Sequence, residues 1–386
     1  GLLIFIVKSS NVKVVVAIDS FKGSLSSLQN SIIIKNAIKE IIPNAEVISI
    51  PIADGGEGTV EAFVESLGGE YIEVNVHDPL NRMIKSKYGF IEGGKTAIIE
   101  MAAASGLSLL SKNERNPLYT STYGTGELIL DALNKNAEQI ILGIGGSATN
   151  DGGIGAASAL GVEFVDGLNK KTGINGLSLK DIKSISMSKI DKRLDKVKIS
   201  VLSDVTNPLL GNYGATKIYG PQKGCTDDLI ELLESGLTNL VNVVKHDLNL
   251  DYENIPGSGA AGGLGYGLIT FLNAELKNGI NTIIDLLNIE EYIKTADFVI
   301  TGEGKMDNQT SFNKAPWGIM KLAKKHKKPI IGLCAILDND EDNILSENFD
   351  FLFSIVNDEV TLEQSLSKPE YYLMELSKRI ADDVIK

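Results

Sequence analysis

The chain has 386 residues, of which 43% are hydrophobic and 23% charged, as is typical of a globular protein with room for two domains. Its 50 acidic and 37 basic side chains give a net charge of −13, which argues against nucleic-acid binding because that needs a basic surface. Two distant cysteines and three isolated histidines exclude a disulfide framework and a cysteine-rich or multi-histidine metal site. No segment reaches the length of a membrane-spanning helix, and we expect a cytoplasmic protein.

The first part of the chain alternates apolar strands with amphipathic helices. Residues 12–19 (VKVVVAID) are β-branched and almost wholly apolar, which predicts a buried parallel strand that ends at a carboxylate. A helix is expected over residues 27–42, a second strand over residues 46–52 and a second helix over residues 59–67. This alternation predicts a parallel sheet with crossover helices.

The middle of the chain, residues 68–288, has a different pattern. Alternating strands are expected over residues 71–76 and 85–90, before a long glycine-rich region and a few longer helices. The strand and helix rhythm of the first part then returns toward the C-terminus. Strands are predicted there over residues 297–301, 329–336 and 349–356, and helices over residues 316–325 and 371–385.

The two ends of the chain therefore predict one three-layer α/β domain with about five parallel strands. We expect residues 1–67 and 289–386 to form this discontinuous domain, with residues 68–288 inserted as a second α/β domain. A ligand cleft is expected between the domains, at the carboxyl ends of the parallel strands, where open α/β sheets bind their ligands.

A polar loop follows the first predicted strand. Residues 19–24 (DSFKGS) place Asp19, Ser20 and Lys22 ahead of a helix, whose N-terminus attracts anions. An ordinary helix start, capped by Ser24 or Ser26 with Lys22 in solvent, fits the same pattern.

A second polar loop follows the second strand. Residues 51–59 (PIADGGEGT) combine the carboxylates of Asp54 and Glu57 with glycines that include Gly55 and Gly56. The two carboxylates could bind Mg²⁺ or a substrate hydroxyl, since hard cations prefer oxygen ligands. The structural alternative is a tight turn followed by a capped helix.

The third motif, residues 143–153 (GIGGSATNDGG), follows an apolar strand over residues 139–142. Its G-x-G-x-x-A match raises dinucleotide binding, but the acidic residue that would bind the ribose is not clearly placed. The small and hydroxyl residues, with Ser147, Asn150 and Asp151 among them, fit a phosphate-binding loop at least as well. A plain glycine-rich turn is the structural alternative.

Three further loops carry candidate residues: one after a strand over residues 198–202, a tight turn GPQKG, and the segment GSGAAGG at a helix start. The last matches G-x-G-x-x-G, but no strand precedes it, so a dinucleotide fold is not indicated. Its backbone N–H groups are an expected anion site. The candidates in these loops are Asp204, Asn207, Gln222, Lys223, Gly257, Ser258 and Gly259.

The seventh motif, residues 301–310 (TGEGKMDNQT), follows the strand near residue 300. Carboxylates alternating with lysine suit phosphoryl transfer, in which Mg²⁺ bridges the phosphates and lysine neutralises the developing charge. A solvated loop with surface ion pairs is the alternative. Its candidate residues are Gly302, Glu303, Gly304, Lys305, Asp307 and Gln309, with Lys314 following. No Walker A motif and no protein-kinase signature occurs in the sequence.

Taken in order from about Val12 to the C-terminus, these seven motifs resemble those of the bacterial type-1 glycerate kinase family. The resemblance implies ATP-dependent phosphorylation of D-glycerate to 2- or 3-phosphoglycerate with Mg²⁺. It also implies a flavodoxin-like domain with a second α/β domain inserted. Two positions depart from the family's usual pattern: Asn313 stands where glycine is usual, and Cys334-Ala335-Ile336 stands where Ala-Gly-Ser is usual.

On this resemblance we assign hypothetical roles. The expected catalytic residues are Lys22, Asp54, Asp151, Asp204 and Lys305. The expected substrate-binding residues are Asp19, Ser20, Gly55, Gly56, Glu57, Ser147, Asn150, Asn207, Gln222 and Lys223. The expected nucleotide-binding residues are Gly257, Ser258, Gly259, Gly302, Glu303, Gly304, Gln309 and Lys314. Asp307 and Glu303 are the expected Mg²⁺ ligands, and Asp54 or Asp204 would accept or position the proton of the attacking hydroxyl.

Two other functions stay open at this point. A nicotinamide-dependent oxidoreductase is raised by the loop after residue 142, and it would bind NAD(H) without needing Mg²⁺. A non-catalytic protein that binds a phosphorylated metabolite on the same fold is raised by Asn313 and Ile336. For the kinase, the expected partners are glycerate and ATP, with no nucleic acid or membrane. A homodimer is the assembly considered, although the sequence does not decide the oligomeric state.

Overall fold

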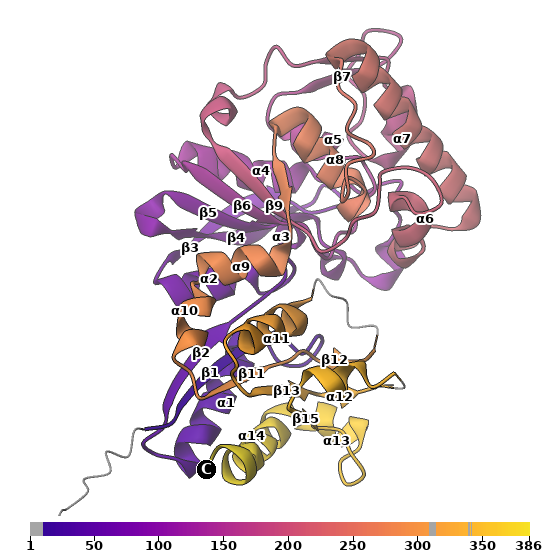
Figure 1. Ribbon diagram of the computed structural model, residues 1–386. Coiled ribbons are helices and arrows are strands. Elements are labelled where there is room, and N and C mark those ends of the chain that lie inside the picture. Colours follow the sequence, from indigo (N-terminus) through magenta and orange to yellow (C-terminus); the bar gives the residue numbers. More distant parts are fainter. Residues whose placement is uncertain (1–10, 309–313, 339, 341) are drawn as a thin grey trace, which may run out of the picture. The chain divides into compact units, whose positions relative to one another are not determined.

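The computed structural model describes residues 11–308, 314–338, 340 and 342–386 (Figure 1). The chain forms two compact units: unit one is Gly1–Ala53 with Ile283–Lys386, and unit two is Asp54–Thr282. We had expected the boundaries after residues 67 and 288. The first boundary lies earlier because the helix that follows Ala53 packs on the sheet of unit two, where its Val64 faces Gly89.

Unit one contains a five-stranded sheet in the order β15-β13-β11-β1-β2, and every pair of neighbours in it is parallel. The strands are β1 Lys13–Ile18, β2 Glu46–Pro51, β11 Phe298–Thr301, β13 Ile330–Cys334 and β15 Phe351–Ser354. Read along the chain, this is the flavodoxin order. The predicted flavodoxin-like α/β fold class is confirmed. β1 is wholly buried after its first residue, as its apolar run predicts.

The helices of unit one cover both faces of this sheet. They are α1 Ser27–Ile41, α10 Ile289–Lys294, α11 Ala315–Lys325, α12 Ile344–Asn348, α13 Leu362–Ser367 and α14 Pro369–Ile380, and a π-helical turn Ala381–Ile385 follows. α1 and α14 pack together on one face, and α11 packs on the other (Figure 1). The short strands β12 Lys305–Met306 and β14 Ile336–Leu337 pair beyond the main sheet.

Unit two contains a six-stranded mixed sheet in the order β10-β9-β6-β5-β4-β3. Its strands are β3 Glu70–His77, β4 Met83–Ile91, β5 Thr96–Glu100, β6 Gln139–Gly143, β9 Lys198–Leu202 and β10 Glu275–Lys277. β5, β6, β9 and β10 run parallel, so their carboxyl ends share one edge, whereas β3 and β4 are antiparallel additions. A small hairpin, β7 Glu163–Val165 and β8 Ser184–Ser186, lies outside this sheet.

Helices cover both faces of the unit-two sheet as well. They are α2 Thr59–Leu67, α3 Ala102–Ser105, α4 Tyr123–Asn134, α5 Ile154–Ala159, α6 Ala215–Tyr219, α7 Asp227–Leu248 and α8 Ala260–Leu272, and α9 Gly279–Leu286 crosses the unit boundary. Successive β4 residues point to opposite faces. Gly89 faces Val64 of α2, and Phe90 belongs to the buried core of unit two, which also includes Leu133 of α4. No described helix is both long enough and apolar enough to cross a bilayer.

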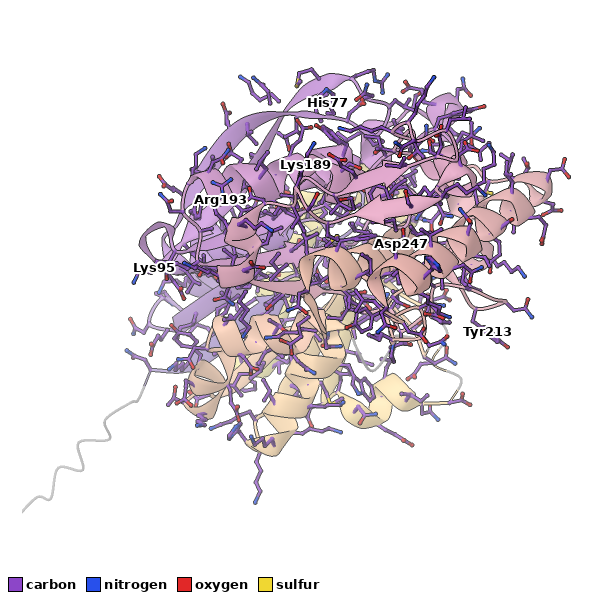
Figure 2. The ribbon with its side chains drawn as sticks, turned by 90° about the horizontal axis from the view of Figure 1, so that it is seen from above. His77, Lys95, Lys189, Arg193, Tyr213 and Asp247 are labelled. Atoms are coloured by element: carbon purple, nitrogen blue, oxygen red, sulfur yellow. The ribbon has the colours of Figure 1, made fainter. Side chains whose placement is uncertain are left out.

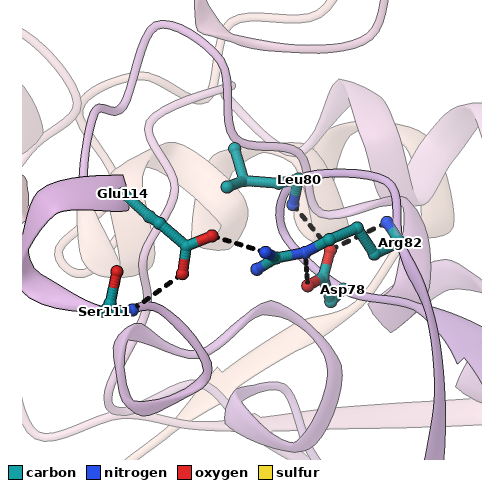
Figure 3. Close-up of polar contacts among 5 residues, drawn as sticks. All are labelled: Asp78, Leu80, Arg82, Ser111 and Glu114. Carbon is teal, nitrogen blue, oxygen red and sulfur yellow. Dashed lines mark hydrogen bonds and ion pairs between the residues drawn. The ribbon is translucent and has the colours of Figure 1, made fainter.

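The turn between β3 and β4 is fixed by the buried carboxylate of Asp78 (Figure 3). It accepts hydrogen bonds from the backbone N–H groups of Leu80 and Arg82, both at 2.9 Å. The Arg82 guanidinium donates to the same carboxylate at 2.7 Å and also pairs with Glu114 (Figure 3). This connection ties the hairpin to the segment that precedes α4.

Candidate functional site

The loop that follows β2 lies directly over the carboxyl ends of β6 and β9. Gly143 and Leu202, the last residues of those strands, are register partners. A Cβ atom at Gly143 would lie 2.0 Å from the carbonyl oxygen of Gly55, and one at Gly55 would lie 2.8 Å from that of Leu202. Gly55 also has a φ of 103°, which side-chain-bearing residues rarely adopt. These glycines therefore allow backbone-to-backbone contact that no other residue would permit.

This contact brings the predicted residues Asp54 and Asp204 to the same place. A Cβ atom at Gly279, the first residue of α9, would lie 2.0 Å from the Asp54 carbonyl oxygen and 3.1 Å from the Asp204 carboxylate. Asp54 also accepts the Gly56 N–H through Oδ1 at 3.2 Å, and both aspartates are only partly buried. Glu57, by contrast, is exposed. Unit two thus presents two carboxylates at one edge of its parallel strands.

Sequence reasoning missed Glu100, the last residue of β5, which is the register partner of Gly143. Its Oε2 accepts the backbone N–H of Val60, in the first turn of α2, at 2.9 Å. Burial raises the pKa of Glu100 to about 7, and the nearby carboxylates of Glu57 and Glu61 act in the same direction. The available signal was the one used for Asp19: a carboxylate that ends an apolar strand.

The loop after β6 is anchored inside unit two by Asp151. This side chain is fully enclosed, and it accepts the Thr122 N–H and hydroxyl, each at 2.8 Å, and the Gly153 N–H at 2.9 Å. Burial raises the pKa of Asp151. These contacts fix the start of α5, and the catalytic role expected for Asp151 stays a prediction.

Lys223 is also enclosed, with 5% of its surface exposed, and its Nζ donates to the Thr149 carbonyl oxygen at 2.7 Å. Burial lowers the pKa of Lys223 to about 7, while the charge of Asp151 acts in the opposite direction. The neighbouring Gln222, on the same short 3₁₀ turn, is exposed. The two predicted substrate-binding residues of this turn therefore occupy different environments.

Asn150 lies beside this lysine contact and is fully buried. Its amide donates to the Thr216 hydroxyl at 2.8 Å. Among the described residues, its Oδ1 has no hydrogen-bond partner, and neither has the Thr149 hydroxyl. Ser147, 8% exposed, forms an isolated bridge with Gly106. Two buried acceptors are therefore available to donors that the described chain does not supply.

The segment GSGAAGG has a packing role. The N–H groups of Gly257 and Gly259 donate to the Asn207 carbonyl oxygen at 3.2 and 3.0 Å, and the Ser258 hydroxyl donates to Glu253 at 2.7 Å. All three are buried. The N–H groups of Gly257 and Gly259 are therefore engaged within the chain, and the nucleotide-binding role expected for this segment stays a prediction. The Asn207 side chain accepts from the Tyr219 hydroxyl at 2.8 Å, so its oxygen is also engaged.

In unit one, the loops after β1 and β11 lie against each other. The Asp19 N–H donates to the Gly302 carbonyl oxygen at 3.0 Å, and a Cβ atom at Gly304 would lie 3.2 Å from the Phe21 Cα. The Asp19 carboxylate accepts the Ser20 N–H at 2.7 Å. Two predicted loops, DSFKGS and TGEGKMDNQT, thus meet at the carboxyl ends of adjacent parallel strands.

The lysines of these loops are exposed. Lys22 lies in solvent ahead of α1, whose capping box is made by Ser26 and Gln29, so the ordinary helix-start alternative is confirmed for this cap. Lys305 pairs with Asp338 at 3.1 Å across half-exposed side chains, a contact that contributes little stability. Lys314 is exposed as the N-cap of α11.

Glu303 and Asp307 are partly buried carboxylates in the same segment. Within the described ranges, no group of three or more His, Cys, Asp and Glu side chains could by itself hold a metal ion. Mg²⁺ typically binds one or two carboxylates together with phosphates and waters, so this donor set fits a nucleotide-bound ion. Gln309, predicted to bind the nucleotide, and Asn313 lie outside the described residues.

The departure at Ile336 lies in the same region. Ile336 pairs in register with Lys305, and the N–H groups of Ala335 and Ile336 donate to the Gly304 carbonyl oxygen at 3.0 and 2.9 Å. Cys334 before them is buried, and burial raises the pKa of its thiol to about 12. The strand end is therefore held to the glycine-rich loop by backbone hydrogen bonds.

A surface cavity of about 400 Å³ in unit two lies on other residues. Its lining includes Tyr123, Lys171 and Lys189, and none of the predicted site residues. Lys189, labelled in Figure 2, is mostly exposed and pairs with Glu163 at 3.1 Å.

Comparisons with known proteins give one family. The sequence profile of the glycerate kinase family matches residues 14–385. A glycerate kinase from Halalkalibacterium halodurans is 45% identical over 368 residues, which cover 95% of this chain and 97% of that protein. A glycerate 2-kinase from Escherichia coli K12 is 43% identical over 369 residues, 96% of this chain and 97% of that one. A crystal structure of a protein assigned as glycerate kinase 2 from Salmonella typhimurium LT2 has a TM-score of 0.86 and 41% identity, covering 97% of this chain and 99% of that chain.

Proposed function

The chain belongs to the glycerate kinase family, and on this premise we propose that it transfers the γ-phosphoryl group of ATP to D-glycerate with the aid of Mg²⁺. The observation that supports this most directly is that the Asp54 backbone carbonyl and the Asp204 carboxylate both lie next to Gly279, on the loops that follow β2 and β9. Phosphoryl transfer requires a carboxylate that accepts or orients the proton of the acceptor hydroxyl. Two half-buried carboxylates at a strand-end edge meet that requirement.

We assign the acceptor side of the reaction to unit two. Asp54 or Asp204 orients the attacking hydroxyl and takes its proton. The unpartnered Asn150 Oδ1 and Thr149 hydroxyl are acceptors suited to the remaining hydroxyl of glycerate, which donates hydrogen bonds. Asp151 is assigned a positioning role, because its hydrogen bond with the Gly153 N–H fixes the loop that carries Asn150.

We assign the phosphate side to the unit-one loops. Lys22 and Lys305 are exposed cations on strand-end loops, as charge stabilisation of a transferred phosphoryl group requires. Glu303 and Asp307 would hold Mg²⁺, which supplies charge neutralisation of the phosphates when bound. Gly302 and Gly304 keep the loop backbone close to β1 and β13, and Lys314 begins α11 nearby in sequence.

One relative, the glycerate 2-kinase from Escherichia coli, favours O2 of glycerate as the acceptor atom. We therefore propose 2-phosphoglycerate as the product and the cytoplasm as the compartment, the latter supported by two buried free cysteines. The dinucleotide alternative has less support: after β6 the next helix begins only at Ile154, so the G-x-G-x-x-A match does not open a helix.

The test is ADP formation by the purified protein with Mg-ATP, with and without D-glycerate, followed by phosphorus NMR of the product. Glycerate-dependent ADP with a 2-phosphoglycerate signal is the expected result. Conversion to 3-phosphoglycerate would correct the acceptor atom only. ADP formation that glycerate does not increase, in a folded protein, would contradict the proposed substrate. NADH formation from glycerate and NAD⁺ would favour the oxidoreductase instead.

A further inference from the structure

Helix α2 begins without a cap of its own. The residue before it, Gly58, has a φ of 92° and no side chain, yet the first-turn N–H groups of a helix need acceptors from outside. Glu100 supplies one, because its Oε2 accepts the Val60 N–H at 2.9 Å. A carboxylate at this end of a helix is further favoured by the helix dipole. The cap of α2 thus comes from a different strand.

β5, the strand that ends at Glu100, lies next to the strands on which the loop of residues 54–58 rests. Glu100 is the register partner of Gly143, on which Gly55 rests, and Gly143 in turn pairs with Leu202. The ends of β5, β6 and β9 therefore form one row beneath the loop. Two of these ends contact its glycines, and the third, through Glu100, binds the helix into which the loop runs.

The loop itself has little freedom between these supports. The Thr59 hydroxyl donates to the Gly56 carbonyl oxygen at 2.7 Å, and Asp54 accepts the Gly56 N–H at 3.2 Å. If the first turn of α2 moved, Thr59 and Gly56 would therefore move with it, and Asp54 would be displaced. Among the described residues, Glu100 is the side chain of this row of strand ends that bonds to that turn.

We propose that Glu100 is a positioning residue for the reaction, holding Asp54 in place by capping α2 across the sheet. This inference rests on the proposed function for its kinetic part, although the capping contact itself does not. The part of Glu100 that matters is an acceptor oxygen at the right distance. Glutamine keeps that oxygen and the length of the side chain, whereas alanine removes both.

The experiment compares Glu100→Gln and Glu100→Ala with Glu138→Ala, a matched control at an exposed glutamate of the same unit. Hydrogen exchange of the peptide that covers residues 54–64 is measured for each, together with kcat and KM for D-glycerate. We expect Glu100→Ala to raise exchange at this peptide and to lower kcat/KM by about 10-fold or more, as loss of a helix cap near reacting groups would. Glu100→Gln should restore both to within about 3-fold, and the control should change neither.

Two results would overturn the proposal. Glutamine and alanine variants that lose activity equally, with normal exchange, would show that the charge of Glu100 acts on the reacting groups directly. An alanine variant with wild-type exchange and wild-type kinetics would show that the cap does not position the loop. Should Glu100→Ala not fold, Glu100→Asp, which is one methylene shorter, replaces it with the same expected outcome. Wild-type protein without glycerate-dependent ADP would defeat the proposed function, whereas the exchange comparison would still decide the capping role.

Discussion

Replacing Gly143 by alanine tests whether contact between backbones positions the Asp54 loop. The new Cβ atom would lie 2.0 Å from the Gly55 carbonyl oxygen and 2.7 Å from its carbon. An ordinary contact begins near 3.4 Å, so the loop would have to move by about 1.4 Å. Gly143 has no positive φ, so alanine adds no backbone strain of its own. The expected effect is therefore steric and is directed at Gly55.

A misplacement of about 1 Å near reacting atoms costs about 100-fold in rate, which corresponds to about 2.7 kcal/mol of transition-state stabilisation. We expect Gly143→Ala to lose about that factor in kcat/KM for D-glycerate. Gly145→Ala should lose less, because its Cβ would lie 2.9 Å from the Gly56 Cα. The matched control is Gly167→Ala, whose Cβ would meet nothing nearer than Lys183 Cγ at 3.7 Å.

The assay is ADP release at varied glycerate, with thermal unfolding followed in parallel. A folded Gly143→Ala protein with wild-type kcat/KM would refute the reasoning, because the loop would then tolerate a shift or would not carry the acceptor-side carboxylate. Equal losses for the Gly143 and Gly167 variants would refute it as well, since the second substitution adds no contact at the site.

Three further predictions follow from single contacts. Asp204→Asn should lower kcat by about 100-fold or more, since a positioned base contributes about that factor, while the melting temperature is retained. An unchanged kcat in the ADP assay would show that another residue takes the proton. The pKa of Glu100 is about 7 when folded and 4.5 ordinarily, so its contribution to stability is present below pH 4.5 and lost as pH rises through 7. Glu100→Gln should therefore gain up to about 3 kcal/mol over wild type between these pH values in urea unfolding, and a pH-independent difference would contradict this. Asp78→Ala should lower the free energy of unfolding by about 2 kcal/mol, because the carboxylate fixes a turn through the N–H groups of Leu80 and Arg82. The kcat for glycerate should not change. A large loss of kcat in a stable protein would contradict this structural role.

Much of the fold could be predicted from the sequence because its signals are local. An uninterrupted apolar run such as Lys13–Ile18 predicts a buried parallel strand before any partner is known. Glycine clusters and carboxylates directly after such runs indicated the loops that carry Asp54 and Asp204. These two loops follow strands of different sheets, β2 and β9, so strand order alone did not predict that they meet.

The tertiary structure alone decided which groups are enclosed and which are held by distant partners. Lys223 and Gln222 are sequence neighbours, yet one is buried and the other exposed. The boundary at Ala53 depends on which sheet α2 packs against. Glu100 caps a helix that starts far from it in sequence. Hydrophobic periodicity shows which face of a helix or strand is buried. It carries no information on which distant N–H group lacks a hydrogen-bond acceptor. The partner of such a group is determined only when the strands take their order in the sheet.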